Sequence, residues 1–108
     1  MLVFTEPASP EVEAEYNRWY DEQHLPEVCA WSGITGARRF KLNPRSPGAS
    51  RSGEARYLAV YDLDCDDPRA LVRDLQVAAG DGRLHMSDAL RVDPPPVVKL
   101  YDVWEGGG

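Results

Sequence analysis

The sequence predicts a single α+β domain whose elements follow the order strand, helix, strand, strand, helix, strand. Short runs of β-branched and aromatic residues recur four times along the chain, as expected for strands. Two amphipathic stretches begin with helix-capping residues, and proline or glycine separates most of these segments. The 108 residues are enough to bury one hydrophobic core and too few for two.

The first expected strand is the apolar run LVFT at residues 2–5, which Pro7 and Pro10 bring to an end. A helix begins at Ser9, because serine is a favourable N-cap and Pro10 suits the first helical position. The glutamates that follow are favoured in the first turns by the helix dipole. The apolar stripe of this helix comprises Val12, Tyr16, Trp19, Tyr20 and the methylene groups of Gln23.

The first helix should end or kink near His24. Leu25 precedes Pro26, and a residue before proline resists the α conformation. We expect a further short turn over residues 26–30.

The second expected strand covers residues 33–42 and alternates apolar with polar side chains. Strict alternation predicts that Ile34, Arg38, Phe40 and Leu42 share one face, opposite Thr35, Ala37, Arg39 and Lys41. Residues 43–54 are rich in proline, glycine, serine and arginine, so we expect a mobile loop with no part in the core.

The third strand is expected at residues 56–64, followed by a second helix that Asp66, Asp67 and Pro68 introduce. Gly80 and Gly82 should stop this helix, whose apolar stripe comprises Leu71, Val72, Leu75, Ala78 and Ala79. The last strand is expected at residues 97–104, and residues 105–108 form a frayed tail. This order is that of ferredoxin-like folds, in which two helices cover one face of a four-stranded antiparallel sheet.

The expected strands at residues 2–5, 56–64 and 97–104 carry apolar side chains on both faces. Two helices cover only one face of a sheet, so the other face needs a partner. A second copy of the chain, packed sheet to sheet as a twofold homodimer, is the expected cover. A monomer that tolerates a few exposed aliphatic side chains is the alternative.

Composition argues against several classes of partner. The net charge of −6 opposes attraction to nucleic acid or anionic lipid, and no apolar run is long enough to span a membrane. The acidic beginning of the chain is unlike a signal peptide, so we expect a cytoplasmic protein whose Cys29 and Cys65 are reduced. Neither a metal-ligand cluster nor a nucleotide-binding motif is present, and we expect no cofactor.

Two stretches carry a family resemblance: EYNRWYDEQHLPEV at residues 15–28 and GITGARRFKL at residues 33–42. Both resemble the EthD-like group of dimeric α/β-barrel proteins, in which a helix ends in W-Y-x-x-H-L-P before a glycine-led strand with an arginine pair. The matching positions are Trp19, Tyr20, His24, Leu25, Pro26, Gly33, Arg38, Arg39 and Phe40.

The resemblance implies a dimeric α/β barrel with a pocket in each subunit between sheet and helices, commonly lined by the helix-end histidine. The superfamily includes polyketide cyclases of natural product biosynthesis, lactone isomerases and cofactor-free monooxygenases. It also includes haem enzymes, which leaves haem binding through His24 as an alternative.

His24 is the main catalytic candidate, because its imidazole can gain or lose a proton near neutral pH. The alternative is a structural role, in which His24 caps carbonyl groups that Pro26 leaves free. Tyr20, one turn earlier, could donate a phenolic hydrogen bond to a substrate carbonyl or could simply pack in the core. Asp21 could orient the imidazole, although its helical position favours solvent.

The candidate substrate-binding residues are Trp19, Arg38, Tyr57 and Tyr61. Arg38 could anchor an anionic or enolate-like ligand, or extend to water from the sheet edge. Tyr57 and Tyr61 share one face of their strand and could line a pocket or fill the core. His85 lies in a polar segment and is expected at the surface.

The sequence therefore predicts a cofactor-free cyclase, isomerase, dehydratase or oxygenase that acts on an apolar, carbonyl-bearing metabolite such as a polyketide, with His24 as general acid or base. The alternative is an accessory protein that binds a hydrophobic metabolite without transforming it. A structural interaction domain without a pocket is a third possibility.

Overall fold

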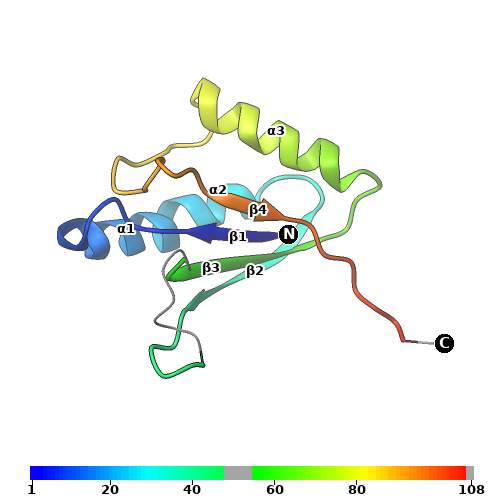
Figure 1. Ribbon diagram of the computed structural model, residues 1–108. Coiled ribbons are helices and arrows are strands. Elements are labelled where there is room, and N and C mark those ends of the chain that lie inside the picture. The colour runs from blue at the N-terminus through cyan, green and yellow to red at the C-terminus, as the bar shows by residue number, and fades with distance from the viewer. Residues whose placement is uncertain (48–54, 107–108) are drawn as a thin grey trace.

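The computed structural model describes residues 1–47 and 55–106 as an α+β fold. Figure 1 shows a four-stranded antiparallel sheet with the strand order β2-β3-β1-β4. This order is compatible with a ferredoxin-like fold and confirms the α+β prediction. The strands are β1 (Leu2–Thr5), β2 (Ile34–Lys41), β3 (Tyr57–Leu63) and β4 (Val97–Lys99).

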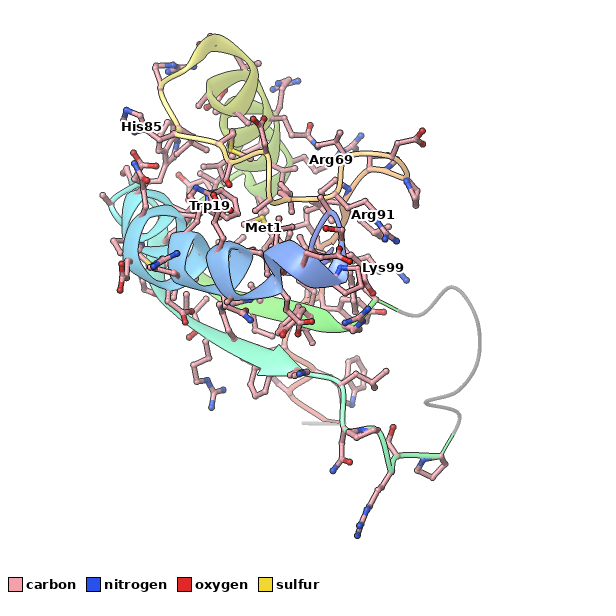
Figure 2. The ribbon with its side chains drawn as sticks, turned by 90° about the vertical axis from the view of Figure 1, so that its left-hand side faces the viewer. Met1, Trp19, Arg69, His85, Arg91 and Lys99 are labelled. Carbon is pink, nitrogen blue, oxygen red and sulfur yellow. The ribbon has the colours of Figure 1, made fainter. Side chains whose placement is uncertain are left out.

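Both helical parts lie on the same side of the sheet (Figure 2). The first is a continuous helical stretch between β1 and β2, and the second is α3 (Pro68–Asp81), between β3 and β4. The first stretch consists of a 3₁₀ turn η1 (Pro10–Val12), α1 (Glu13–Trp19), a π-helical segment η2 (Tyr20–His24) and α2 (Leu25–Cys29). Within the described residues, no helix is long and apolar enough to cross a membrane.

The capping residues predict the helix starts correctly. Ser9 has an extended backbone before Pro10 and occupies the N-cap position, although its side chain makes no capping hydrogen bond. The Asp67 carboxylate accepts a hydrogen bond from the Ala70 amide at 3.1 Å. Gly82 ends α3 with a φ of 90°, a left-handed conformation that glycine adopts without steric cost.

The expectation that the first helix ends or kinks because Leu25 resists the helical conformation is wrong. Leu25 is helical, with φ −59° and ψ −48°, and the chain stays helical through Pro26 to Cys29. The Leu25 N–H bonds back five residues to the Tyr20 carbonyl, which makes a wider π-helical turn. This wider turn relieves the clash between a proline ring and the preceding helical turn.

The expected phase of β2 is also wrong. The pairing with β3 shifts between Ile34 and Gly36, which marks a β-bulge. Beyond the bulge Ala37 and Arg39 follow Ile34 toward the helices, whereas Arg38 and Phe40 lie on the outer face. One additional residue reverses the faces of every position that follows it.

The last strand is shorter than expected, because β4 covers only Val97–Lys99 rather than residues 97–104. Its neighbour β1 begins at Leu2, which pairs with Lys99, so residues further along the chain have no strand beside them. The chain then leaves the sheet (Figure 1). The expected mobile loop at residues 43–54 is described only as far as residue 47, and residues 43–47 form turns. Of the expected frayed tail, residues 105–106 have no regular structure. Residues 48–54 and 107–108 lie outside the described residues.

The core fills the space between the sheet and the helices. It is built by three aromatic residues of the first helical stretch, three alternate residues of β3 and three residues of α3. These residues are Tyr16, Trp19, Tyr20, Tyr57, Ala59, Tyr61, Leu71, Leu75 and Ala78. The apolar stripes predicted for both helices therefore face the core, except that Gln23 is exposed.

Candidate functional site

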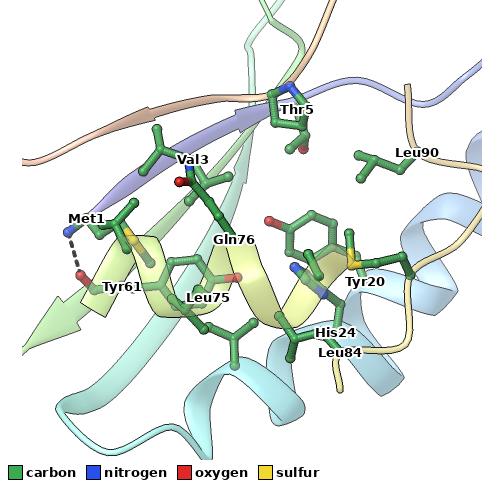
Figure 3. Close-up of a pocket in the computed structure, with 16 residues that line it drawn as sticks. Met1, Val3, Thr5, Tyr20, His24, Tyr61, Leu75, Gln76, Leu84 and Leu90 are labelled. Carbon is green, nitrogen blue, oxygen red and sulfur yellow. Dashed lines mark hydrogen bonds between the residues drawn. The ribbon is translucent and has the colours of Figure 1, made fainter. Parts of the chain in front are cut away.

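A pocket of about 130 Å³ opens between the sheet and the two helical parts that cover it. Its walls come from β1, β3 and β4, from η2, α2 and α3, and from the segment between α3 and β4 (Figure 3). Most of the lining is apolar. The lining residues are Met1, Val3, Thr5, Tyr20, His24, Val28, Tyr61, Val72, Leu75, Gln76, Ala79, Leu84, Met86, Leu90, Pro96 and Val98.

His24 lies in this pocket together with Tyr20, because both belong to η2. A regular α-helical wheel puts His24 on the flank of the buried face, but the π-helical turn changes that angle. The His24 ring stacks on the Trp19 indole with centroids 4.6 Å apart, and it meets the Tyr20 ring edge-on at 4.9 Å. Two aromatic neighbours thus fix the orientation of the imidazole.

Three polar atoms in the pocket have no hydrogen-bond partner among the described residues. They are the hydroxyl oxygens of Tyr20 and Tyr61 and Nδ1 of His24. The two tyrosines are 1% and 2% exposed, so their hydroxyls are almost completely removed from solvent. Figure 3 shows all three groups pointing into the same part of the pocket. Because native proteins pair nearly all buried polar groups, this set indicates that water or a ligand occupies this part of the pocket.

Burial sets the protonation states of these groups. It lowers the pKa of His24 to about 4; the nearby carboxylate of Glu27 raises it and the Arg39 guanidinium lowers it. Burial also raises the pKa of Tyr20 to about 12, and it raises the pKa of Tyr61, to which the adjacent Tyr20 adds. At neutral pH the pocket therefore offers a neutral imidazole and two protonated phenols.

The alternative role of His24, as a cap for carbonyl groups freed by Pro26, has no hydrogen bond to support it in the described residues, since Nδ1 is unpaired. Asp21 does not orient the imidazole either. Its carboxylate accepts a hydrogen bond from Nη1 of Arg39 at 2.8 Å instead. Both observations leave the His24 imidazole available to a ligand.

The other predicted binding residues lie outside the pocket lining. Trp19 packs behind His24, and its Nε1–H donates to the His85 carbonyl at 2.8 Å. The Tyr57 hydroxyl donates to Glu13 and accepts from Asn17. Trp19 is therefore a packing residue with a bonded indole N–H, and Tyr57 fills the core with its hydroxyl bonded, which was the stated alternative for Tyr57.

Arg38, the remaining predicted ligand contact, projects from the outer face of β2, because the bulge changed the phase of the strand. The arginine on the helix side is Arg39, which the sequence did not single out beyond the family pattern. Its guanidinium carbon lies 4.3 Å from the centre of the Tyr20 ring, and Nη2 donates to Asn17 at 2.9 Å. Arg39 therefore supports the back of the Tyr20 ring through cation–π attraction.

The segment 83–90 forms the mouth of the pocket, where Met86 is exposed and Leu84 is buried. His85 is at the surface, as expected, but it is bound there. Its backbone N–H and its ring nitrogen Nδ1 both contact the Glu27 carboxylate, at 3.0 and 2.5 Å. Figure 2 shows Trp19 and His85 near one another, where this segment passes over the helical stretch. Sequence reasoning missed Glu27, because nothing local indicates a bond across 58 residues.

No family model, curated protein or solved structure matches this chain. The resemblance to the EthD-like group thus remains a prediction, and the chemistry rests on the pocket itself. Over residues 1–47 and 55–106, no group of three His, Cys, Asp or Glu side chains is placed to hold a metal ion.

The arrangement can do three things chemically. A neutral imidazole accepts a proton, while two phenolic O–H groups donate hydrogen bonds to an oxygen that gains negative charge. The apolar walls exclude water and strengthen both interactions. Such a set suits the removal of a proton next to a carbonyl group.

Proposed function

We propose that this protein is a cofactor-free enzyme that enolises a small apolar carbonyl compound, with His24 as the general base. The observation that carries the proposal is the convergence of three unpaired polar groups, from Tyr20, His24 and Tyr61, in one apolar pocket. Cyclisation, isomerisation and dehydration of a carbonyl-bearing metabolite, such as the buried end of a polyketide, all begin with such a step.

The step is balanced within the pocket. A C–H bond next to the substrate carbonyl breaks, its proton moves to Nδ1 of His24, and the electron pair shifts to the carbonyl oxygen. The Tyr20 and Tyr61 hydroxyls donate to that oxygen and stabilise the enolate. Return of the proton to the same or another carbon completes the reaction and restores the imidazole.

The lowered pKa of His24 is compatible with this role. Burial disfavours an isolated imidazolium, which keeps the free protein in the form that accepts a proton. Once the proton has moved, the imidazolium lies beside the enolate, and an opposite charge at close range favours the charged form. Burial therefore disfavours the imidazolium in the free protein, and the imidazolium becomes stable only when the enolate is beside it.

Exchange of α-protons for deuterium tests the proposal without knowledge of the natural substrate. In D₂O, the wild-type protein should accelerate the exchange of small neutral ketones such as acetone and cyclohexanone, as followed by proton NMR. His24→Ala should reduce the protein-dependent rate by about 10²- to 10⁴-fold, the usual contribution of one acid–base group. The acid limb of the wild-type profile should lie near pH 4, where His24 becomes protonated.

His85→Ala is the matched control, because it removes the other histidine, whose side chain is 66% exposed at the surface. It should leave exchange nearly unchanged. Equal rates for wild type and a folded His24→Ala variant would refute the catalytic role. Binding without any exchange would favour the alternative, an accessory protein that holds a hydrophobic metabolite.

We also propose that a second copy covers the outer face of the sheet and completes a dimeric α/β barrel. Register pairs four apolar residues into one row across all strands of that face: Phe40, Leu58, Phe4 and Val97. Beyond β4 the side chains of Leu100, Tyr101, Val103 and Trp104 are also exposed, Trp104 to 85%. Burial of such a face against a copy of itself removes apolar area from water on both sides.

A further inference from the structure

We infer that the part of the ligand inside the Tyr20–His24–Tyr61 pocket is an uncharged single ring that carries one carbonyl oxygen. The inference deepens the proposed function and rests on it, since it takes this pocket to be the ligand site. It narrows the ligand from apolar carbonyl compounds in general to monocyclic ketones, or to larger molecules that insert one ketone ring.

The volume of the pocket limits the size of the inserted group. About 130 Å³ is slightly less than the roughly 150 Å³ of an apolar cavity that holds benzene. One six-membered ring fills such a space, whereas a fused or caged ring system exceeds it. Gln76 and Met86 are exposed lining residues, so the pocket reaches the surface there and substituents can extend outward.

The residues that line the pocket determine which charge the ligand can carry. None of the sixteen described lining residues is Asp, Glu, Lys or Arg, and the α-ammonium group of Met1 is bound to the Tyr61 carbonyl at 2.8 Å. Arg39 lies behind the Tyr20 ring and is occupied by Asp21 and Asn17, so it offers no counter-charge inside the pocket. A carboxylate or ammonium group placed here would lose its hydration. Among the described lining side chains only His24 could offset a negative charge, and burial keeps its imidazole neutral by lowering its pKa to about 4.

The polar groups of the pocket determine which functional group the ligand carries. Tyr20 and Tyr61 are both protonated, and each is close enough to the other to influence its pKa. Neither hydroxyl makes a hydrogen bond of normal geometry among the described residues, so each has a hydrogen to donate to a ligand. A carbonyl oxygen has two lone pairs and accepts from both hydroxyls at once. A ring without an oxygen would leave both hydroxyls buried and unsatisfied, which costs free energy.

Binding of four probes at pH 7, followed through the NMR signals of the pocket methyl groups, tests each part of the inference. Cyclohexanone is the reference ligand. Cyclohexanecarboxylate, which is ionised, should bind at least about tenfold more weakly, because it loses its hydration and faces a His24 imidazole that burial keeps neutral. The caged ketone 2-adamantanone should not perturb the pocket signals, because its bulk surrounds the carbonyl group. Cyclohexane tests the contribution of the oxygen.

Phenylalanine variants test the two donors. Tyr20→Phe and Tyr61→Phe should each weaken cyclohexanone binding about two- to tenfold. Neither should weaken the binding of cyclohexane, because the variant has one hydroxyl fewer for that ring to leave unsatisfied. Tyr57→Phe is the matched control, since its hydroxyl bonds to Glu13 outside the pocket and its loss should not affect cyclohexanone. Equal binding of the carboxylate, binding of 2-adamantanone, or no effect of either pocket variant would overturn the inference.

Failure of this inference is distinguishable from failure of the proposed function. Cyclohexanone that binds as expected but exchanges no α-protons leaves the ligand assignment in place and refutes the enzyme. Exchange of acetone that depends on His24, without cyclohexanone binding, supports the enzyme and refutes the ring assignment.

Discussion

The protonation state of His24 follows from the burial of its imidazole ring. The imidazole is enclosed by Trp19 and Tyr20 and has no hydrogen-bond partner at Nδ1 among the described residues. Burial therefore lowers its pKa to about 4 from 6.5. The same property that makes His24 a proton acceptor also links the stability of the fold to pH.

The fold should lose stability as the pH falls through the range from about 6.5 to about 4. In this window the unfolded chain holds a proton on residue 24 that the folded chain does not hold, so acid favours unfolding. The wild type should lose about 2 kcal/mol of unfolding free energy between pH 7 and pH 5 through this group. Urea denaturation at both pH values and at one protein concentration measures the change.

His24→Gln should remove this part of the pH dependence. Glu13, whose carboxyl pKa is lowered in the fold, contributes equally to wild type and variant and cancels in the comparison. The carboxyl pKa of Glu27 is lowered mainly by its hydrogen bond to His85, which the variant retains, and to a smaller extent by the charge of His24. His85→Gln is the control and should retain the dependence on His24. An identical loss in the wild type and in His24→Gln would show that the imidazole is not held neutral by burial.

Individual residues also show where sequence reasoning succeeds. His24 and Tyr20 meet in the pocket because they belong to one helical turn, and such local pairs are readable from the sequence. Tyr61 enters the pocket from β3, as alternation with Tyr57 allowed, but the two hydroxyls have different roles. The positions of Glu13 and Asn17 on α1 decide that Tyr57 is paired, whereas Tyr61 meets no such partner among the described residues.

At the scale of elements, local sequence signals predicted where helices begin and end. They did not predict the phase of β2 or the length of β4. Ser9, Asp67 and Gly82 act within one turn of their helix ends, and all three lie where expected. The bulge in β2 and the short β4 depend on the neighbouring strands instead. A pattern within one strand contains no information about the point at which its partner shifts or begins.

Gly33 shows how an element boundary depends on one residue. It precedes β2 with a φ of 96°, and an added Cβ would lie 3.1 Å from Cβ of Cys65. Gly33→Ala should therefore destabilise the fold by about 1 to 3 kcal/mol, through backbone strain and crowding. The midpoint of urea unfolding measures the loss.

Gly80 provides the matched control for this substitution. It lies within α3, and an added Cβ would meet nothing within 4 Å. Gly80→Ala should stabilise the fold by about 0.5 to 1 kcal/mol, because alanine loses less conformational freedom in a helix. A neutral effect of Gly33→Ala would mean that the turn before β2 tolerates other conformations.

The whole molecule has two faces with different surroundings. The helices and the pocket cover one face of the sheet, and the apolar row Phe40, Leu58, Phe4 and Val97 lies on the other. Phe40 is 44% exposed and Val97 is 49% exposed, although both belong to regular strands. A row of this kind across four strands is larger than the scattered apolar residues that monomers usually expose.

Light scattering at tens of micromolar protein should therefore give a mass of about 24 kDa, twice the 12.0 kDa of one chain. Phe40→Lys and Leu58→Lys should each shift the mass toward the monomer, because a twofold interface places every substitution in the contact twice. Val77→Lys is the control: Val77 is 53% exposed on α3, away from the sheet face, and its substitution should leave the mass unchanged. A wild-type mass near 12 kDa at these concentrations would contradict the dimer, whereas the pocket, which lies on the opposite face of the sheet, would keep its three unpaired groups and its predicted chemistry.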